Sequence, residues 1–99
     1  MRNVYTIDQI RDLLAPVFHK NNVRKAMLFG SYSKGMANEK SDVDIWVDSG
    51  LHGLSFFGLL EDICQTMECD VDLIDRADII PDSPIDQEIR RTGVLLYEQ

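Results

Sequence analysis

The feature that most constrains this chain is a Gly-Ser pair followed, after ten residues, by two aspartates in alternation. An apolar run at 26–29 ends at Gly30 and Ser31, and a second apolar run at 43–47 carries Asp44 and follows directly on Asp42. Both runs have the length and composition of β-strands. Because side chains alternate between the two faces of a strand, Asp42 and Asp44 point to the same side. The sequence therefore predicts two carboxylates that converge on one small volume.

This arrangement favours a site for a divalent metal and a phosphate. Mg²⁺ takes one or two carboxylates from a protein and completes its shell with water and substrate phosphates. A glycine at the end of the preceding strand lets the backbone approach a phosphate, and Ser31 adds a hydroxyl and an amide donor. A Gly-Ser pair or an Asp-x-Asp pair alone is common in solvated turns, so the prediction rests on their combination. Together they indicate a metal-bound nucleoside triphosphate.

The third carboxylate of such a site comes from the strand predicted at about 70–74. Asp70 and Asp72 share one face of this strand, whereas Asp75 points the other way or lies in the following turn. Asp72 lies deeper in the strand, where an acidic residue needs a partner to offset its desolvation. We therefore predict Asp72 as the third carboxylate and keep Asp70 as the alternative.

The rest of the pattern predicts one domain, residues 1–99, in which helices and strands alternate. Apolar periodicity and capping residues predict helices at about 7–20, around 56–67 and from 83 to 92, and strands at about 25–29, 43–47, 70–74 and 94–97. Residues 31–35 suffice for about one helical turn before a polar loop at 38–41. Pro16 is expected to kink the first helix or to end its hydrogen bonding early.

Charge and length limit the partners of this domain. A net charge of -7 argues against a free-standing nucleic-acid binder, since affinity for the phosphate backbone comes from clustered Lys and Arg. No membrane segment or signal peptide is visible, so a cytoplasmic protein is expected. With 99 residues there is little surface for a separate acceptor lobe, which indicates that the acceptor is another molecule.

The motifs resemble those of the minimal nucleotidyltransferases (MNT proteins) of the DNA polymerase beta-like superfamily. The resemblance covers nearly the whole chain and is carried by Gly30-Ser31, by Asp42-Val43-Asp44, by the 71–75 strand with Asp72, and by the ending at 93–98. It implies an α/β (α+β) fold, in which a small mixed β-sheet has its helices packed mainly on one face.

The resemblance also implies roles for individual residues. Asp42, Asp44 and Asp72 would bind two Mg²⁺ ions, and Gly30 and Ser31 would contact the triphosphate of ATP. Many relatives carry Arg where this chain has Lys34, and a lysine keeps the charge but loses the bidentate fork. Lys34 is therefore either a phosphate contact or an ordinary solvated charge.

The implied activity is an enzymatic one, AMP transfer from ATP-Mg to a hydroxyl group. MNT proteins of this type pair with a small helical HEPN protein in toxin-antitoxin modules, and the expected acceptor is a tyrosine of that toxin. Asp72 would also accept the proton of the hydroxyl. The alternatives are an antitoxin that binds nucleotide but acts by masking its partner, and nucleotidyl transfer to a small molecule. Trp46, which alternation places on the face of the aspartates, either lines the nucleotide site or packs under the last helix, and a homo-oligomer remains open.

Overall fold

A computed structural model describes residues 4–38 and 42–99 of the chain. Its elements are, in order, α1 (Ile7–Lys20), β1 (Lys25–Phe29), β2 (Val43–Asp48), α2 (Leu54–Met67), β3 (Val71–Asp75), the 3₁₀ turn η1 (Arg76–Asp78), α3 (Pro84–Thr92) and β4 (Val94–Glu98). Each predicted helix and strand is present, with ends shifted by one or two residues. Of the polar loop predicted at 38–41, residues 39–41 lie outside the described part, as does Ser41 in front of the Asp-x-Asp pair.

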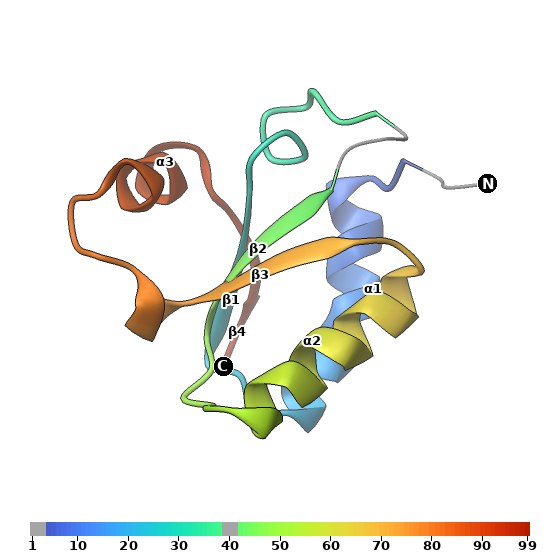
Figure 1. Cartoon of the computed structure of the whole chain (residues 1–99). Coiled ribbons are helices and arrows are strands. Elements are labelled where there is room, and N and C mark those ends of the chain that lie inside the picture. Colours follow the sequence, from blue (N-terminus) through green and yellow to red (C-terminus); the bar gives the residue numbers. More distant parts are fainter. Residues whose placement is uncertain (1–3, 39–41) are drawn as a thin grey trace.

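The four strands form one mixed sheet in the order β3-β2-β1-β4. β1 is antiparallel to both β2 and β4, whereas β2 and β3 are parallel and are joined through α2. Figure 1 shows α1 and α2 together on one face of this sheet and α3 on the other. The predicted fold class, a small mixed sheet with helices mainly on one face, is confirmed.

Alternation along β2 assigns the two faces of the sheet. Val43, Ile45 and Val47 are fully buried against α1 and α2, and they form the core face. Asp44, Trp46 and Asp48 alternate with them and are only partly buried. We call the side of the sheet that carries these three residues the open face, and it is the face that α3 partly covers.

α1 begins at a capping box and continues past its internal proline. Thr6 Oγ1 accepts a hydrogen bond from the backbone N–H of Gln9, and the Gln9 side chain accepts one from the Thr6 N–H. The helix runs without interruption through Pro16 to Lys20, so the early end expected at Pro16 is wrong. A proline removes the donor of one residue only, and the burial of Leu14 and Phe18 on either side holds this helix against the core.

Candidate functional site

Two of the predicted carboxylates face one another across neighbouring strands. The parallel register of β2 and β3 places Asp44 opposite Asp72, and their side chains share a hydrogen bond. Asp70 precedes β3, and its backbone carbonyl accepts a hydrogen bond from the Val43 N–H at 3.2 Å. The strand register therefore favours Asp72 over Asp70 as the third carboxylate of the site. Asp72 is exposed, however, so the desolvation argued from the sequence is not what distinguishes it.

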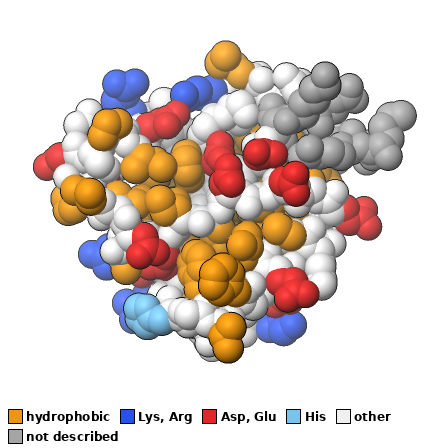
Figure 2. Space-filling view, in the orientation of Figure 1, with side chains coloured by type: hydrophobic (Ala, Val, Ile, Leu, Met, Phe, Trp, Pro, Cys, Tyr) orange, Lys and Arg blue, Asp and Glu red, His pale blue; other side chains and the backbone are white. Residues whose placement is uncertain are grey.

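Asp44 lies where negative charge accumulates. Its pKa is raised to about 6, first by burial, then by the charge of Asp72 and their shared hydrogen bond, and further by Asp42 and Glu88. Asp42 lies just before β2 and is exposed. Figure 2 shows acidic side chains gathered in the upper middle of this side of the molecule. A group of this kind is stabilised by a proton or by a metal cation.

Gly30 brings the backbone of the preceding turn directly against Asp44. It ends β1 with a positive φ of 74°, and a Cβ at this position would collide with Asp44 Oδ2. The turn after it closes through a hydrogen bond from the Lys34 N–H to the Gly30 carbonyl at 3.3 Å, the spacing of one helical turn, as predicted. Ser31 is partly exposed in this turn. Gly30 thus lies against the Asp44 carboxylate, and Ser31 follows it in the turn.

Lys34 forms an ion pair with α3 that the sequence pattern did not predict. Its Nζ lies 2.6 Å from Glu88 Oε1, and both side chains are about one-third exposed, at 40% and 35%. The two residues are 54 positions apart, so no local pattern could pair them. Helical spacing places Glu88 three residues after the half-buried Ile85, on the same side of α3, and an acidic residue there was the available signal.

The donor set suits Mg²⁺, although the carboxylates do not close into a complete cage. Within residues 4–38 and 42–99, no three His, Cys, Asp or Glu side chains form a group that could hold a metal ion. Mg²⁺ needs only one or two protein carboxylates, and Asp44 and Asp72 supply two on adjoining strands. The proximity of Asp72 is one cause of the raised pKa of Asp44, and a bound cation would offset the repulsion between the two carboxylates. The assignment of Asp42, Asp44 and Asp72 as metal ligands stays a prediction.

A cavity of about 860 Å³ lies on the same open face, beside Trp46 and Asp48 of β2. Trp46 and Met27, which are partners in the β1–β2 register, lie along its sheet side, and Ile89 and Arg90 of α3 lie along another. Asp44 and Asp72 lie outside its lining. We call it the Trp46 cavity. Of the two alternatives for Trp46, its position beside α3 agrees with packing under the last helix, and its role in lining the nucleotide site stays a prediction.

One family model matches most of the chain. Residues 12–99 match the family described as "Polymerase beta, Nucleotidyltransferase". The match includes all four strands and every candidate site residue from Gly30 to Asp72.

Similar individual proteins add to this result. A candidate protein adenylyltransferase of Methanocaldococcus jannaschii is 39% identical over 44 residues, which cover 44% of this chain and 47% of that relative. The match thus spans about half the length of the relative. A chain from a crystal structure of a toxin-antitoxin with AMP-PNP superposes with a TM-score of 0.77 at 25% identity, covering 90% of this chain and 73% of that one. A chain from a complex of tri-AMPylated Shewanella oneidensis HEPN toxin with MNT antitoxin gives a TM-score of 0.72 at 21% identity, covering 95% and 74%, and shows the same fold.

Proposed function

The chain belongs to the polymerase beta nucleotidyltransferase family, and we propose that it is an enzyme that transfers AMP from ATP-Mg to a tyrosine hydroxyl of a HEPN-type toxin, acting as its antitoxin. The observation that carries the proposal is the alignment of Gly30, Asp44 and Asp72. Gly30 touches Asp44, and Asp44 faces Asp72, on three successive strand ends. The residues proposed to bind phosphate, to bind the metal and to accept the proton are therefore neighbours at adjacent strand ends.

Each of these groups has a role in the transfer. The amides of Gly30 and Ser31 would hold the triphosphate, and Lys34 would neutralise part of its charge once it leaves Glu88. Asp42, Asp44 and Asp72 would hold Mg²⁺, which when bound lowers the pKa of the attacking hydroxyl and stabilises the leaving pyrophosphate. The hydroxyl oxygen forms a bond to the α-phosphorus, and the bond from that phosphorus to the bridging oxygen breaks. Asp72, being exposed, can accept the hydroxyl proton and release it to water.

The proposed acceptor is a protein, and charge and size support this choice. The domain has a radius of gyration of 12.6 Å and a net charge of -7. An acidic surface would attract a basic RNA-cleaving partner, since complementary charge accelerates encounter and favours the correct partner. The two toxin-antitoxin structures with similar chains, one of which contains an AMPylated toxin, support the same assignment. The reaction would take place in the cytoplasm.

Intact-mass measurement tests the proposal. The protein is incubated with ATP, Mg²⁺ and the purified HEPN-type protein that we expect to be encoded nearby, and one or more AMP units should appear on that protein. The Asp42→Asn/Asp44→Asn variant should leave its mass unchanged, because it keeps side-chain size but removes the charge that holds the metal.

Two outcomes would contradict the proposal. If the pair forms a tight complex and the toxin is inhibited without any mass increment at long times, the protein acts by masking. If AMP appears instead on a small hydroxyl compound supplied in place of the toxin, and never on the toxin, the acceptor class is wrong.

A further inference from the structure

We propose that the Trp46 cavity receives the adenine base of ATP, with the indole of Trp46 as its stacking surface and Asp48 as the acceptor for its amino group. The inference rests on the proposed function, which supplies the nucleotide, and it adds the subsite that selects the base. The alternative occupant, the acceptor side chain, is one outcome of the fluorescence experiment that tests the inference.

Position along the strand links the cavity to the carboxylates. Trp46 follows Asp44 by two residues on the same face of β2, which separates their Cα atoms by about 6.6 Å. Asp44 pairs with Phe29 and Asp72, whereas Trp46 pairs with Met27 and Ile74 in the neighbouring row. One row of the sheet thus carries the carboxylates and the next carries the aromatic ring. A ribose is of the right size to bridge from the row of the carboxylates to the row of Trp46.

The direction of the reaction points the nucleoside towards the same cavity. In an in-line displacement the attacking oxygen, the phosphorus and the leaving oxygen lie on one line. The proposed triphosphate site at Gly30 and the proposed proton acceptor Asp72 lie on opposite sides of β2, so that line runs across the strands. The ribose leaves the α-phosphorus sideways from this line. Of the two directions along the strands on the open face, one leads from Asp44 to Trp46 and the cavity beside it.

The cavity has the size and surface of a base-binding site. Its volume of about 860 Å³ falls within the range of about 300–1,000 Å³ typical of small-molecule sites. Met27 and Ile89 add apolar walls beside the indole. Stacking of a base on an aromatic side chain is favourable for any base, so Trp46 supplies affinity and a polar group must supply selectivity.

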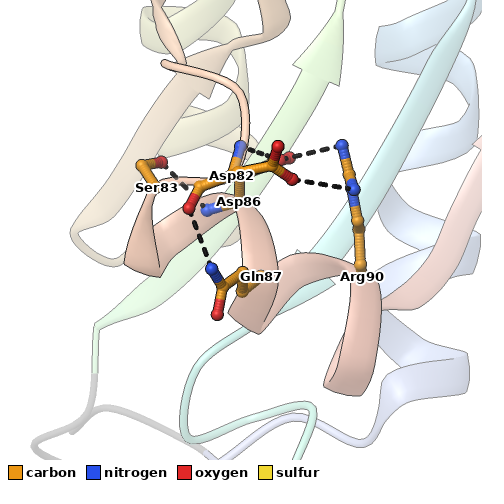
Figure 3. A network of polar contacts seen from close by, with 5 residues as sticks. All are labelled: Asp82, Ser83, Asp86, Gln87 and Arg90. Atoms are coloured by element: carbon orange, nitrogen blue, oxygen red, sulfur yellow. Dashed lines mark hydrogen bonds and ion pairs between the residues drawn. The ribbon is translucent and has the colours of Figure 1, made fainter.

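Asp48 is the carboxylate of the lining that has unused hydrogen-bonding capacity. It lines the cavity two residues beyond Trp46, and its carboxylate has no hydrogen-bond or ion-pair partner in the described part of the chain. Arg90, by contrast, is already engaged by Asp86 at 2.9 Å and Asp82 at 3.4 Å, in the polar network that fixes the start of α3 (Figure 3). Adenine carries an exocyclic amine that can donate to a carboxylate. Asp48 therefore favours adenine over a base with a carbonyl at the same position.

Trp46 is the single tryptophan of the chain, so its fluorescence reports on the cavity directly. The parent protein is titrated with ATP-Mg and, separately, with inorganic tripolyphosphate-Mg, while calorimetry records binding of both. We expect both ligands to bind but only ATP to change the Trp46 emission. Trp46→Leu should lower ATP affinity by roughly tenfold to a hundredfold and leave tripolyphosphate affinity unchanged, Trp46→Phe should retain most of it, and Phe57→Leu, on an exposed part of α2, should match the parent.

The inference and the proposed function fail in different ways. If both ligands bind, ATP leaves the emission unchanged and Trp46→Leu binds ATP like the parent, the base lies elsewhere and the inference is overturned while the phosphate and metal site stands. If an emission change appears only when the toxin is added, the cavity holds the acceptor and the inference is also overturned. If neither ligand binds, the proposed function fails and the inference with it.

Asp48 has its own test. The parent should bind ATP about tenfold or more tightly than inosine triphosphate, which carries a carbonyl in place of the amine, because the carboxylate would be left facing an acceptor. Asp48→Asn, whose amide can donate, should reduce or reverse this preference. An unchanged preference in Asp48→Asn would overturn the role given to Asp48.

Discussion

Asp44 is the residue of the proposed site whose ionised carboxylate lowers the stability of the fold. Its pKa is raised from 3.8 to about 6, so between these values the folded chain holds a proton that the unfolded chain has lost. Stability therefore falls as pH rises through this range, which is the opposite of the behaviour of a salt-bridged aspartate. The carboxylate is kept charged at neutral pH against this tendency, which is expected of a metal ligand.

The first prediction concerns Asp44→Asn in metal-free buffer. At pH 7.5 the variant should be more stable than the parent by about 1 kcal/mol, a figure reduced from the full linkage value because the carboxyl is partly solvated. The difference should disappear towards pH 4, where the parent carboxyl is protonated. Urea unfolding across this pH range measures it, with Asp12→Asn on α1 as a control for the loss of one exposed negative charge. Identical pH slopes for the parent and Asp44→Asn would refute the electrostatic account.

The second prediction separates two glycines with similar backbones. Gly30 and Gly35 have φ values of 74° and 71°, but only a Cβ at position 30 meets Asp44. Gly35→Ala should cost about 1–2 kcal/mol of stability from the left-handed conformation alone. Gly30→Ala should cost at least as much and also displace the Asp44 carboxylate, with loss of ATP-Mg binding by calorimetry. Normal ATP-Mg binding in Gly30→Ala would show that this close contact is dispensable.

At the scale of elements, β3 shows what could be predicted from the sequence and what could not. Apolar alternation located the strand, and it placed Asp72 and Asp75 on opposite faces as the structure has them, because these are local properties. The parallel register that sets Asp72 against Asp44 depends on packing between segments remote in sequence. The same holds for the Lys34–Glu88 pair and the Trp46 cavity, which arise only when α3 lies over the open face.

β3 also carries two aspartates for which we predict opposite defects. Asp75 is only 4% exposed, and its carboxylate accepts hydrogen bonds from the Ser49 hydroxyl at 2.6 Å, the Ser49 N–H at 3.1 Å and the Ala77 N–H at 2.9 Å. Asp75→Asn should lower the free energy of unfolding by about 1–3 kcal/mol, because an amide donor would face these donors. Asp72→Asn should keep or slightly raise its stability, because it relieves the repulsion on Asp44, and should keep most of its ATP affinity but lose about 10²–10⁴ in transfer rate. Urea unfolding and single-turnover AMP transfer, measured on both variants, should therefore rank them in opposite order.

A fully active Asp72→Asn would return the third-carboxylate role to Asp70, and Asp70→Asn is the matched variant that decides it. Asp70 is exposed and precedes the strand, so its loss should change neither stability nor rate by much.

At the scale of the whole molecule, the charge balance and the candidate site are physically linked. The domain carries a net charge of -7, and part of that charge is concentrated at one end of its open face. No helix in the described part of the chain is long and apolar enough to cross a membrane. A cation or a basic partner would reduce the repulsion among these acidic side chains. The proposed site offers a place for the cation.

The last prediction tests this balance through stability. Ligand that binds only the folded state at 100 times its dissociation constant adds about 2.7 kcal/mol to the free energy of unfolding. For a domain of this size that corresponds to a rise in Tm of roughly 10–20 °C. Thermal unfolding with ATP and Mg²⁺ should show this rise, and ATP with a chelator should not. Asp42→Asn/Asp44→Asn should lose the rise, whereas Asp12→Asn/Glu61→Gln, which removes the same charge from the helices of the core face, should keep it. An equal rise without metal, or in the Asp42→Asn/Asp44→Asn variant, would mean that ATP is held by something other than these carboxylates.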